Sequence, residues 1–287
     1  GKTIYIEPTQ VVEANNKVRE LENEERREKK RLLKQITDTI RPLIPAIRSS
    51  FEMLALTDFL NAKAKLAREL NAIEPIVENK PLINWHGAIH PVLFCNFKQQ
   101  NRQVVPLNIE LNNAKRILII SGPNAGGKSV CLKTVALLQY MMQCGMLVPL
   151  REDSTMGVFQ QMMIDIGDSQ SIADDLSTYS SHLKNMKFFL RHADRNTLIL
   201  IDEFGGGTEP LIGGAIAEAT LLQLNEQQTF GVITTHYTNL KHLAEETDGL
   251  TNGAMLYDRG QLQPLFQLSQ GQAGSSFALE IAHQIGL

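Results

Sequence analysis

The stretch from Ser121 to Ser129 has the residues and the spacing of a loop that binds phosphate. It reads Ser-Gly-Pro-Asn-Ala-Gly-Gly-Lys-Ser after the apolar run Ile117–Ile120, which fits the P-loop pattern G-x-x-x-x-G-K-[ST]. Glycines let backbone N–H groups approach phosphate oxygens, the lysine charge suits the β- and γ-phosphates, and the hydroxyl suits Mg²⁺. The sequence therefore predicts nucleotide binding by Gly122, Pro123, Asn124, Ala125, Gly126, Gly127, Lys128, Ser129 and Val130, with Ser129 as a Mg²⁺ ligand.

A glycine-rich turn that matches this pattern by chance is the alternative interpretation. However, an apolar run precedes the loop and a helical pattern, roughly residues 129–144, follows it. Strand, loop and helix thus fall in the order that the motif requires, and the positive end of the helix would point at the phosphates.

Two carboxylates follow a second apolar run, Thr197–Ile201. Asp202 and Glu203 come directly after it, as acids do at the carboxyl edge of a buried parallel sheet. Phosphoryl transfer to water requires one acid in the Mg²⁺ shell and a second that orients or polarises the water. We therefore predict that Asp202 is a metal ligand and that Glu203 is catalytic; the alternative is a strand that merely ends in surface acids.

A third apolar run, Phe230–Thr234, also ends in polar residues, with His236 near its tip. This histidine could reach the γ-phosphate or the attacking water, although a lone histidine at a strand end is more often structural. Strand and helix patterns alternate over residues 86–287. They predict an α/β domain with a mixed, mostly parallel sheet and flanking helices.

The first 85 residues read as helical. A helix is expected after Pro8, but residues 22–31 are all polar, with four glutamates among five lysines or arginines. Such a stretch projects into solvent, and we favour this interpretation over a contact with nucleic acid. Pro42 and Pro45 interrupt the pattern, and the apolar residues of 51–70 predict an antiparallel partner. We therefore expect an α-helical hairpin in residues 1–85, before the domain of residues 86–287.

Composition sets limits on the function. The chain has 287 residues, 43% hydrophobic and 21% charged, and no apolar stretch approaches the length of a membrane span. Its three cysteines show no metal-ligand spacing, so we expect reduced thiols in the cytoplasm. The net charge of −3 gives no general attraction to nucleic acid. Because the sequence begins at Gly1 without a signal-like start and ends in mid-pattern, we expect a piece of a longer protein.

Three motifs together resemble the MutS family of ABC-type ATPases: Gly122–Ser129, Asp202–Thr208 and Thr234–Tyr237. The chain is also similar to the second bacterial branch of that family, whose full-length members carry a C-terminal Smr nuclease domain. That similarity rests on Gly1–Pro8, Leu176–His182 and Ser276–Ala282. The resemblance covers nearly the whole chain. It implies an ABC-type P-loop ATPase domain preceded by an incomplete core and lever region, with nuclease activity expected only from a domain absent from this sequence.

The resemblance also implies how the site works. Two ATPase domains would dimerise around two ATP sites, and the signature loop at Ser177 and Thr178 would complete the partner's P-loop. Asn124 matches the family asparagine that helps to place the attacking water, and His236 matches its switch histidine. The implied catalytic residues are therefore Glu203, His236 and Asn124.

Two positions depart from the mismatch-repair branch of the family. Val130 stands where a second hydroxyl residue is usual. The resemblance places the D-loop of the dimer interface at Gly205–Glu209, and its residues Gly205–Gly207 lack an arginine that is often present there. The second departure puts the coupling across the dimer in doubt. The resemblance does not place the residues that stack on adenine; Val104 and Val105, upstream of the P-loop, are candidates.

The function that the family implies is a homodimer that uses ATP and Mg²⁺ to clamp mismatched or branched DNA in repair or recombination. An alternative is an ATPase that acts on stalled ribosomes, as some relatives do. A transporter subunit would share the P-loop, but its Leu-Ser-Gly-Gly-Gln signature is missing. A binding module without turnover would not need Glu203. A nuclease finds no support in clustered His, Asp or Glu at metal spacing beyond the ATP site.

Overall fold

The computed structural model of the chain describes residues 8–123, 126–167, 175–258, 260–261 and 263–274, without the side chains of 175–178. It divides into two compact units, residues 1–62 and 63–287. This division falls earlier than the boundary expected at residues 85/86, because strands β1 (Ile76–Glu78) and β2 (Ile83–Ala88) pair with strands of the second unit. The assignment of residues 1–85 to a core and lever region stays a prediction.

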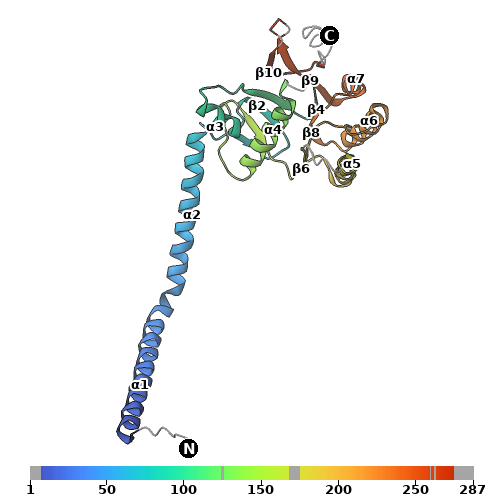
Figure 1. Cartoon of the computed structure of the whole chain (residues 1–287). Helices are drawn as coiled ribbons and strands as arrows, with labels where there is room; N and C mark the ends of the chain where they lie inside the picture. Colours follow the sequence, from blue (N-terminus) through green and yellow to red (C-terminus); the bar gives the residue numbers. More distant parts are fainter. Residues whose placement is uncertain (1–7, 124–125, 168–174, 259, 262, 275–287) are drawn as a thin grey trace, which may run out of the picture. The chain divides into compact units, whose positions relative to one another are not determined.

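Helices form the described part of the first unit (Figure 1). Helix α1 (Thr9–Ile40) begins after Pro8, the short 3-10 helix η1 (Arg41–Leu43) follows it, and helix α2 (Ile44–Glu69) comes next. Every residue from 8 to 62 is exposed. None of the described helices in either unit is long and apolar enough to cross a membrane.

The predicted antiparallel hairpin is wrong for these residues. The backbone keeps right-handed helical angles at Ile40, Arg41 and Ile44, so the chain bends instead of reversing, and α2 follows α1 without packing along it (Figure 1). The prolines explain the difference. Pro42 and Pro45 stand in the first turns of η1 and α2, where a missing N–H group is tolerated, so they interrupt the helix without producing a turn.

The second unit contains two sheets. A four-stranded sheet has the order β1-β5-β2-β3 and a six-stranded sheet has the order β10-β9-β4-β8-β7-β6. In the larger sheet every neighbouring pair from β9 to β6 is parallel, and β10 is antiparallel to β9. Its strands are β4 (Lys115–Ser121), β6 (Gln161–Asp165), β7 (Thr197–Ile201), β8 (Phe230–Thr234), β9 (Gly249–Asp258) and β10 (Gln263–Gln270). The smaller sheet adds β3 (Leu107–Leu111) and β5 (Thr155–Gly157).

Helices cover both faces of the large sheet because its central strands are apolar on both sides. All five residues of β7 and of β8 are buried, which is typical of strands inside a parallel sheet. On β4, Leu118 and Ile120 pack with helix α4, whereas Ile117 and Ile119 pack with α5, α6 and α7. These helices are α3 (Pro91–Gln99), α4 (Lys128–Gln143), α5 (Asp175–His192), α6 (Pro210–Glu226) and α7 (Thr238–Glu246). The predicted α/β class, with a parallel-rich sheet and flanking helices, is confirmed.

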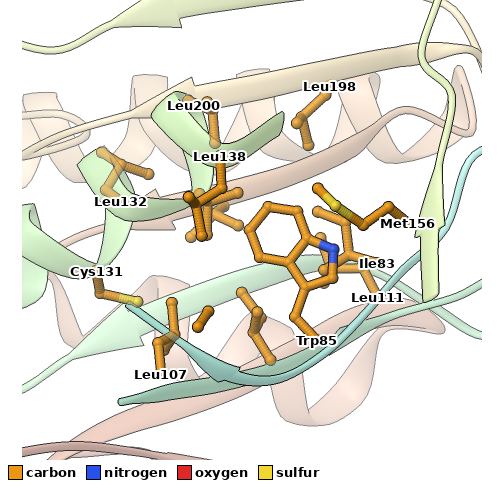
Figure 2. Packing of buried hydrophobic residues seen from close by; sticks show 14 of the residues in the cluster. Ile83, Trp85, Leu107, Leu111, Cys131, Leu132, Leu138, Met156, Leu198 and Leu200 are labelled. Carbon is orange, nitrogen blue, oxygen red and sulfur yellow. The ribbon is translucent and has the colours of Figure 1, made fainter. Parts of the chain in front are cut away.

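The two sheets share one hydrophobic core. Trp85 and Ile83 of β2 lie fully buried against Leu132 and Leu138 of α4 and Leu200 of β7 (Figure 2). The small sheet is therefore packed on α4, the helix that follows the predicted P-loop. Burial at this interface fixes the position of that helix.

We expect Leu138→Ala to lower the free energy of unfolding by about 2–5 kcal/mol, because it removes buried methyl groups and leaves a cavity. Leu138 is 0% exposed. The matched control is Leu211→Ala, the same chemical change in the same unit, since Leu211 is 81% exposed and should cost no more than about 0.5 kcal/mol. Urea unfolding followed by circular dichroism measures both. Equal losses in the two variants would contradict the assignment of the core.

Candidate active site

The predicted site residues converge at one edge of the large sheet. Strands β4, β8 and β7 are neighbours and run parallel, so the loops that follow them leave the sheet at the same edge. The P-loop follows β4, His236 lies beyond β8, and Asp202 and Glu203 follow β7. Backbone bonds extend the register past the strand ends: the N–H of Thr235 donates to Ile120 O at 3.1 Å and that of Phe204 to Thr234 O at 2.9 Å.

A threonine hydroxyl at the end of β8 holds both acidic residues. Thr234 Oγ1 donates to Asp202 Oδ1, and the same oxygen accepts the N–H of Glu203 at 2.8 Å. Glu203 has a φ of +50°, a left-handed conformation that costs about 1–3 kcal/mol for a residue other than glycine and is found mainly at functional sites. The threonine thus fixes Asp202 and a strained Glu203 together.

The P-loop lysine is buried beside these acids. Lys128 is only 4% exposed, and its Nζ donates to Gly122 O at 2.8 Å and to Pro123 O at 3.1 Å. Burial lowers the pKa of Lys128, while the charges of Asp202 and Glu203 act in the opposite direction. The two acids thus favour the charged form of Lys128, whereas burial disfavours that form.

The remaining P-loop residues lie around the first turn of α4. Gly126, Gly127, Ser129 and Val130 are described, with Lys128 as the first residue of the helix. The backbone of Gly127 is left-handed, with a φ of +93°. Asn124 and Ala125 lie outside the described residues.

A pocket of about 380 Å³ opens beside the P-loop. Its lining includes Gly127 and Val130 of the P-loop, Val104 and Val105, and Phe266 of β10. A Cβ atom on Gly127 would lie 3.0 Å from the ring of Phe266, so the ring stands directly over the loop. Phe266 itself has a φ of +55° and lies in an irregular part of β10, as expected where a bulge redirects a side chain.

His236 lies near the positive charges of Lys128 and Lys241. Desolvation, followed by the Lys128 charge, lowers the pKa of His236, so its ring is neutral at pH 7. Lys241 of α7 adds to this effect. Its Nζ donates to Gly274 O at 2.8 Å, and Gly274 N donates to Ser121 Oγ at 2.8 Å, which ties α7 to the strand that precedes the P-loop.

The predicted D-loop is linked to the strand that carries His236. The hydroxyl of Tyr237 donates to Gly205 O at 2.9 Å. Gly205 has a φ of +86°, and a Cβ atom there would lie 2.7 Å from the Tyr237 ring. Only glycine therefore fits at the start of this loop without displacing the tyrosine.

The helix that carries the predicted signature residues is attached to the strand next to β7. Asp165, at the end of β6, pairs with His182 Nδ1 at 2.6 Å through one carboxylate oxygen, and its other oxygen accepts from Asn185 Nδ2 at 2.9 Å. Asp165 O also accepts the N–H of Asp202 at 2.9 Å. Helix α5 is thus connected to the acidic pair through a single aspartate. Ser177 and Thr178 lie in α5, but their side chains are outside the described ones.

The residues present fit ATP with Mg²⁺. Among the described residues no group of three His, Cys, Asp or Glu side chains could hold a metal, so this part of the chain offers no closed metal cage. Mg²⁺ is usually held by one or two protein oxygens together with substrate phosphates and water. Ser129 and Asp202 can supply such oxygens, and the buried charge of Lys128 suits the phosphates.

Several parts of this site were missed in the sequence. Phe266 and Lys241 lie far along the chain from the P-loop, and Asp165 belongs to no motif that we used. His182 ends the stretch Leu176–His182 that carried the resemblance, but no role was predicted for it. Only the strand order and the bulge in β10 bring these side chains to the site.

The chain is similar to proteins of known families. The family model "MutS domain V" matches residues 118–287. Proteins named endonuclease MutS2 are 41% identical over 287 residues in Gemmatimonas aurantiaca (99% of this chain, 34% of that protein) and 40% identical over 298 residues in Thermomicrobium roseum (100% and 37%). The one from Finegoldia magna is 40% identical over 287 residues (100% and 36%). The chain thus spans about a third of the length of these relatives.

We expect the pKa of His182 in the folded chain to lie above its ordinary value of 6.5, because its bond to Asp165 favours the charged ring. The stabilisation by this pair is then complete below about pH 6.5 and is lost as the pH rises through the raised pKa. A histidine NMR titration of the chain measures the shift.

Asp165→Asn should return the pKa of His182 toward 6.5, whereas Asn185→Ala, which removes the neighbouring neutral donor, should leave it raised. An unchanged titration in Asp165→Asn would show that the pair does not control the protonation of His182.

Proposed function

The chain belongs to the MutS family, and from this premise we propose that it binds and hydrolyses ATP and dimerises around two ATP sites to clamp mismatched or branched DNA. One observation carries the ATPase part of this proposal. The P-loop, the Asp202–Glu203 pair and the strand that leads to His236 meet at one sheet edge, and Thr234 of that strand bonds both acids. Phosphoryl transfer needs a phosphate cradle, a metal ligand and a water-orienting acid together.

Each residue has a separate task in the proposed reaction. Lys128 and the backbone of the P-loop bind the β- and γ-phosphates, and Ser129 and Asp202 hold Mg²⁺, which when bound neutralises phosphate charge. Glu203 orients and polarises the attacking water. Asn124, which lies outside the described residues, is assigned to help place that water through the family resemblance alone. The neutral ring of His236 can donate a hydrogen bond to the γ-phosphate or to that water without adding a charge.

The pocket under Phe266 suits the base of the nucleotide. It adjoins Gly127 and Val130 and is lined by Val104, Val105 and the Phe266 ring, so a flat heterocycle can pack between aliphatic and aromatic surfaces. We therefore assign adenine to this pocket.

The proposed clamp requires communication between the two ATP sites. Ser177 and Thr178 at the start of α5 would contact the nucleotide of the partner, and α5 is tied through Asp165 to Asp202 of its own site. Closure of the partner's ATP site on Ser177 and Thr178 would then act, through α5 and Asp165, on Asp202 in the ATP site of this chain. Switching of the dimer needs the closed state to bind ATP more tightly than the open state by a few kcal/mol.

The nucleic-acid part of the proposal rests on the relatives. These relatives are named endonuclease MutS2, and we infer that the parent protein of this chain is of that type. Any cutting of DNA is then assigned to the part of the relatives that this chain does not match. Within the described residues, no cluster of metal-ligating side chains offers a nuclease site.

We expect Glu203→Ala to bind ATP but to lose at least about 100-fold in turnover, as when a catalytic acid–base group is removed. Lys128→Ala should instead weaken ATP binding. Steady-state hydrolysis and equilibrium binding of ATP by the 287-residue chain measure the two effects. Equal turnover in the unchanged chain and in Glu203→Ala would refute the catalytic assignment.

The same assay tests the dimer when protein concentration is varied. Turnover per chain should rise with concentration, and Ser177→Ala should lower it in mixed dimers. Branched DNA and ribosomes are added in separate arms. A response to branched DNA supports the clamp, whereas a response to ribosomes alone would replace DNA as the partner.

We expect Phe266→Ala to weaken ATP binding by about tenfold, because base stacking on an aromatic ring contributes roughly 1–3 kcal/mol. Binding of inorganic triphosphate should not change, since it has no base. Phe188→Ala is the control, because Phe188 is also exposed, at 52%, but lies on α5. Isothermal titration with both ligands tests this, and an equal loss for triphosphate would contradict the assignment of the pocket to adenine.

A further inference from the structure

A second, larger pocket lies at the opposite edge of the large sheet. It has a volume of about 930 Å³ and lies where strands β4, β7 and β8 begin, whereas the ATPase residues lie where they end. Arg116, Asn196 and Phe230 of these strand starts contribute to its lining, together with the loop 79–82 and the turn 112–114 of the smaller sheet. Its size is within the range of pockets that bind small molecules.

The most unusual residue of this pocket is Arg116. It is 8% exposed, and among the described residues no carboxylate pairs with it. Its Nη1 donates to Asn113 O and its Nη2 to Asn225 Oδ1, both at 2.8 Å. Burial without an acid lowers the pKa of Arg116. A buried charge normally has an ionic partner because desolvation is costly.

One nitrogen of this guanidinium is unsatisfied. Arg116 Nε is buried and finds no hydrogen-bond acceptor within the described part of the chain. Asn225 lies in the last turn of α6, so the negative end of that helix compensates part of the charge. It does not supply an acceptor for Nε.

The rest of the lining is positive or rich in amides. Arg195 is exposed, and no acid pairs with it among the described residues, whereas Lys80 pairs with Glu78 at 2.6 Å. Four lining residues have side-chain amides that make no hydrogen bond within the described residues: Asn79, Asn113, Asn196 and Gln228. A ligand that accepts hydrogen bonds from several directions would suit these groups.

We propose that this pocket binds a small molecule that carries a phosphate group, with Arg116 and Arg195 as its anchors. Phosphate is favoured over carboxylate because it carries more negative charge and more acceptor oxygens, which suits two arginines and the surrounding amide side chains. A phosphate has oxygens that can reach separate donors. The pocket does not depend on the ATPase assignment, since it shares no residue with the P-loop or the acidic pair.

The test uses inorganic pyrophosphate as the probe and the 287-residue chain with Lys128→Ala, which weakens binding at the P-loop. Isothermal titration should detect binding that weakens as salt rises. We expect Arg116→Gln to reduce the affinity by about tenfold or more and Arg195→Ala by about threefold. Arg191→Ala is the matched control, because Arg191 is an exposed arginine outside the pocket and should have no effect.

The choice of variants separates a loss of ligand binding from a loss of folding. Arg116→Gln is compared by urea unfolding with its parent, and Arg195→Ala, which changes an exposed side chain, remains informative if Arg116→Gln does not fold. Absence of pyrophosphate binding, or equal affinity in Arg195→Ala and Arg191→Ala, would overturn the proposal. A single-stranded oligonucleotide forms a second arm: if it binds far more tightly than pyrophosphate and depends on Arg195, the site belongs to nucleic acid instead of a small molecule.

Discussion

The hydroxyl of Thr234 is the contact on which the candidate site depends. It bonds the side chain of Asp202 and the backbone of Glu203 at once, and it does so from the neighbouring strand. A hydroxyl can donate and accept simultaneously, so one small side chain fixes two acids with different proposed tasks. This arrangement is possible only because β7 and β8 are parallel and in register. The chemistry therefore depends on strand pairing as much as on the acids themselves.

Charge balance at the two edges of the sheet differs. At the carboxyl edge, the buried Lys128 has Asp202 and Glu203 close enough to influence its pKa, so the site is balanced internally. At the opposite edge, the buried Arg116 has only neutral acceptors within the described residues. A buried charge without an ionic partner is costly. The second edge would therefore gain from a bound anion, although it contains no motif that we used.

Local patterns predicted much of the fold and of the site, and contacts between distant segments explain the rest. The three apolar runs became β4, β7 and β8, since a strand buried on both faces leaves a continuous apolar signal. Phe266 was missed because only a bulge in β10 turns it toward Gly127. The hairpin was predicted wrongly because prolines signal an interruption but not its angle: the chain stays helical at Arg41 and Ile44.

The strained backbone of Glu203 has a consequence for protein engineering. Its φ of +50° is left-handed. This conformation lowers the free energy of unfolding when the residue has a Cβ atom, but not when it is glycine. A library selected only for heat resistance would therefore drift toward glycine at this position and lose the carboxylate. If Glu203 has the catalytic role that we propose, stability and turnover are opposed at this single residue, so a screen for robust variants needs an activity filter from its first round.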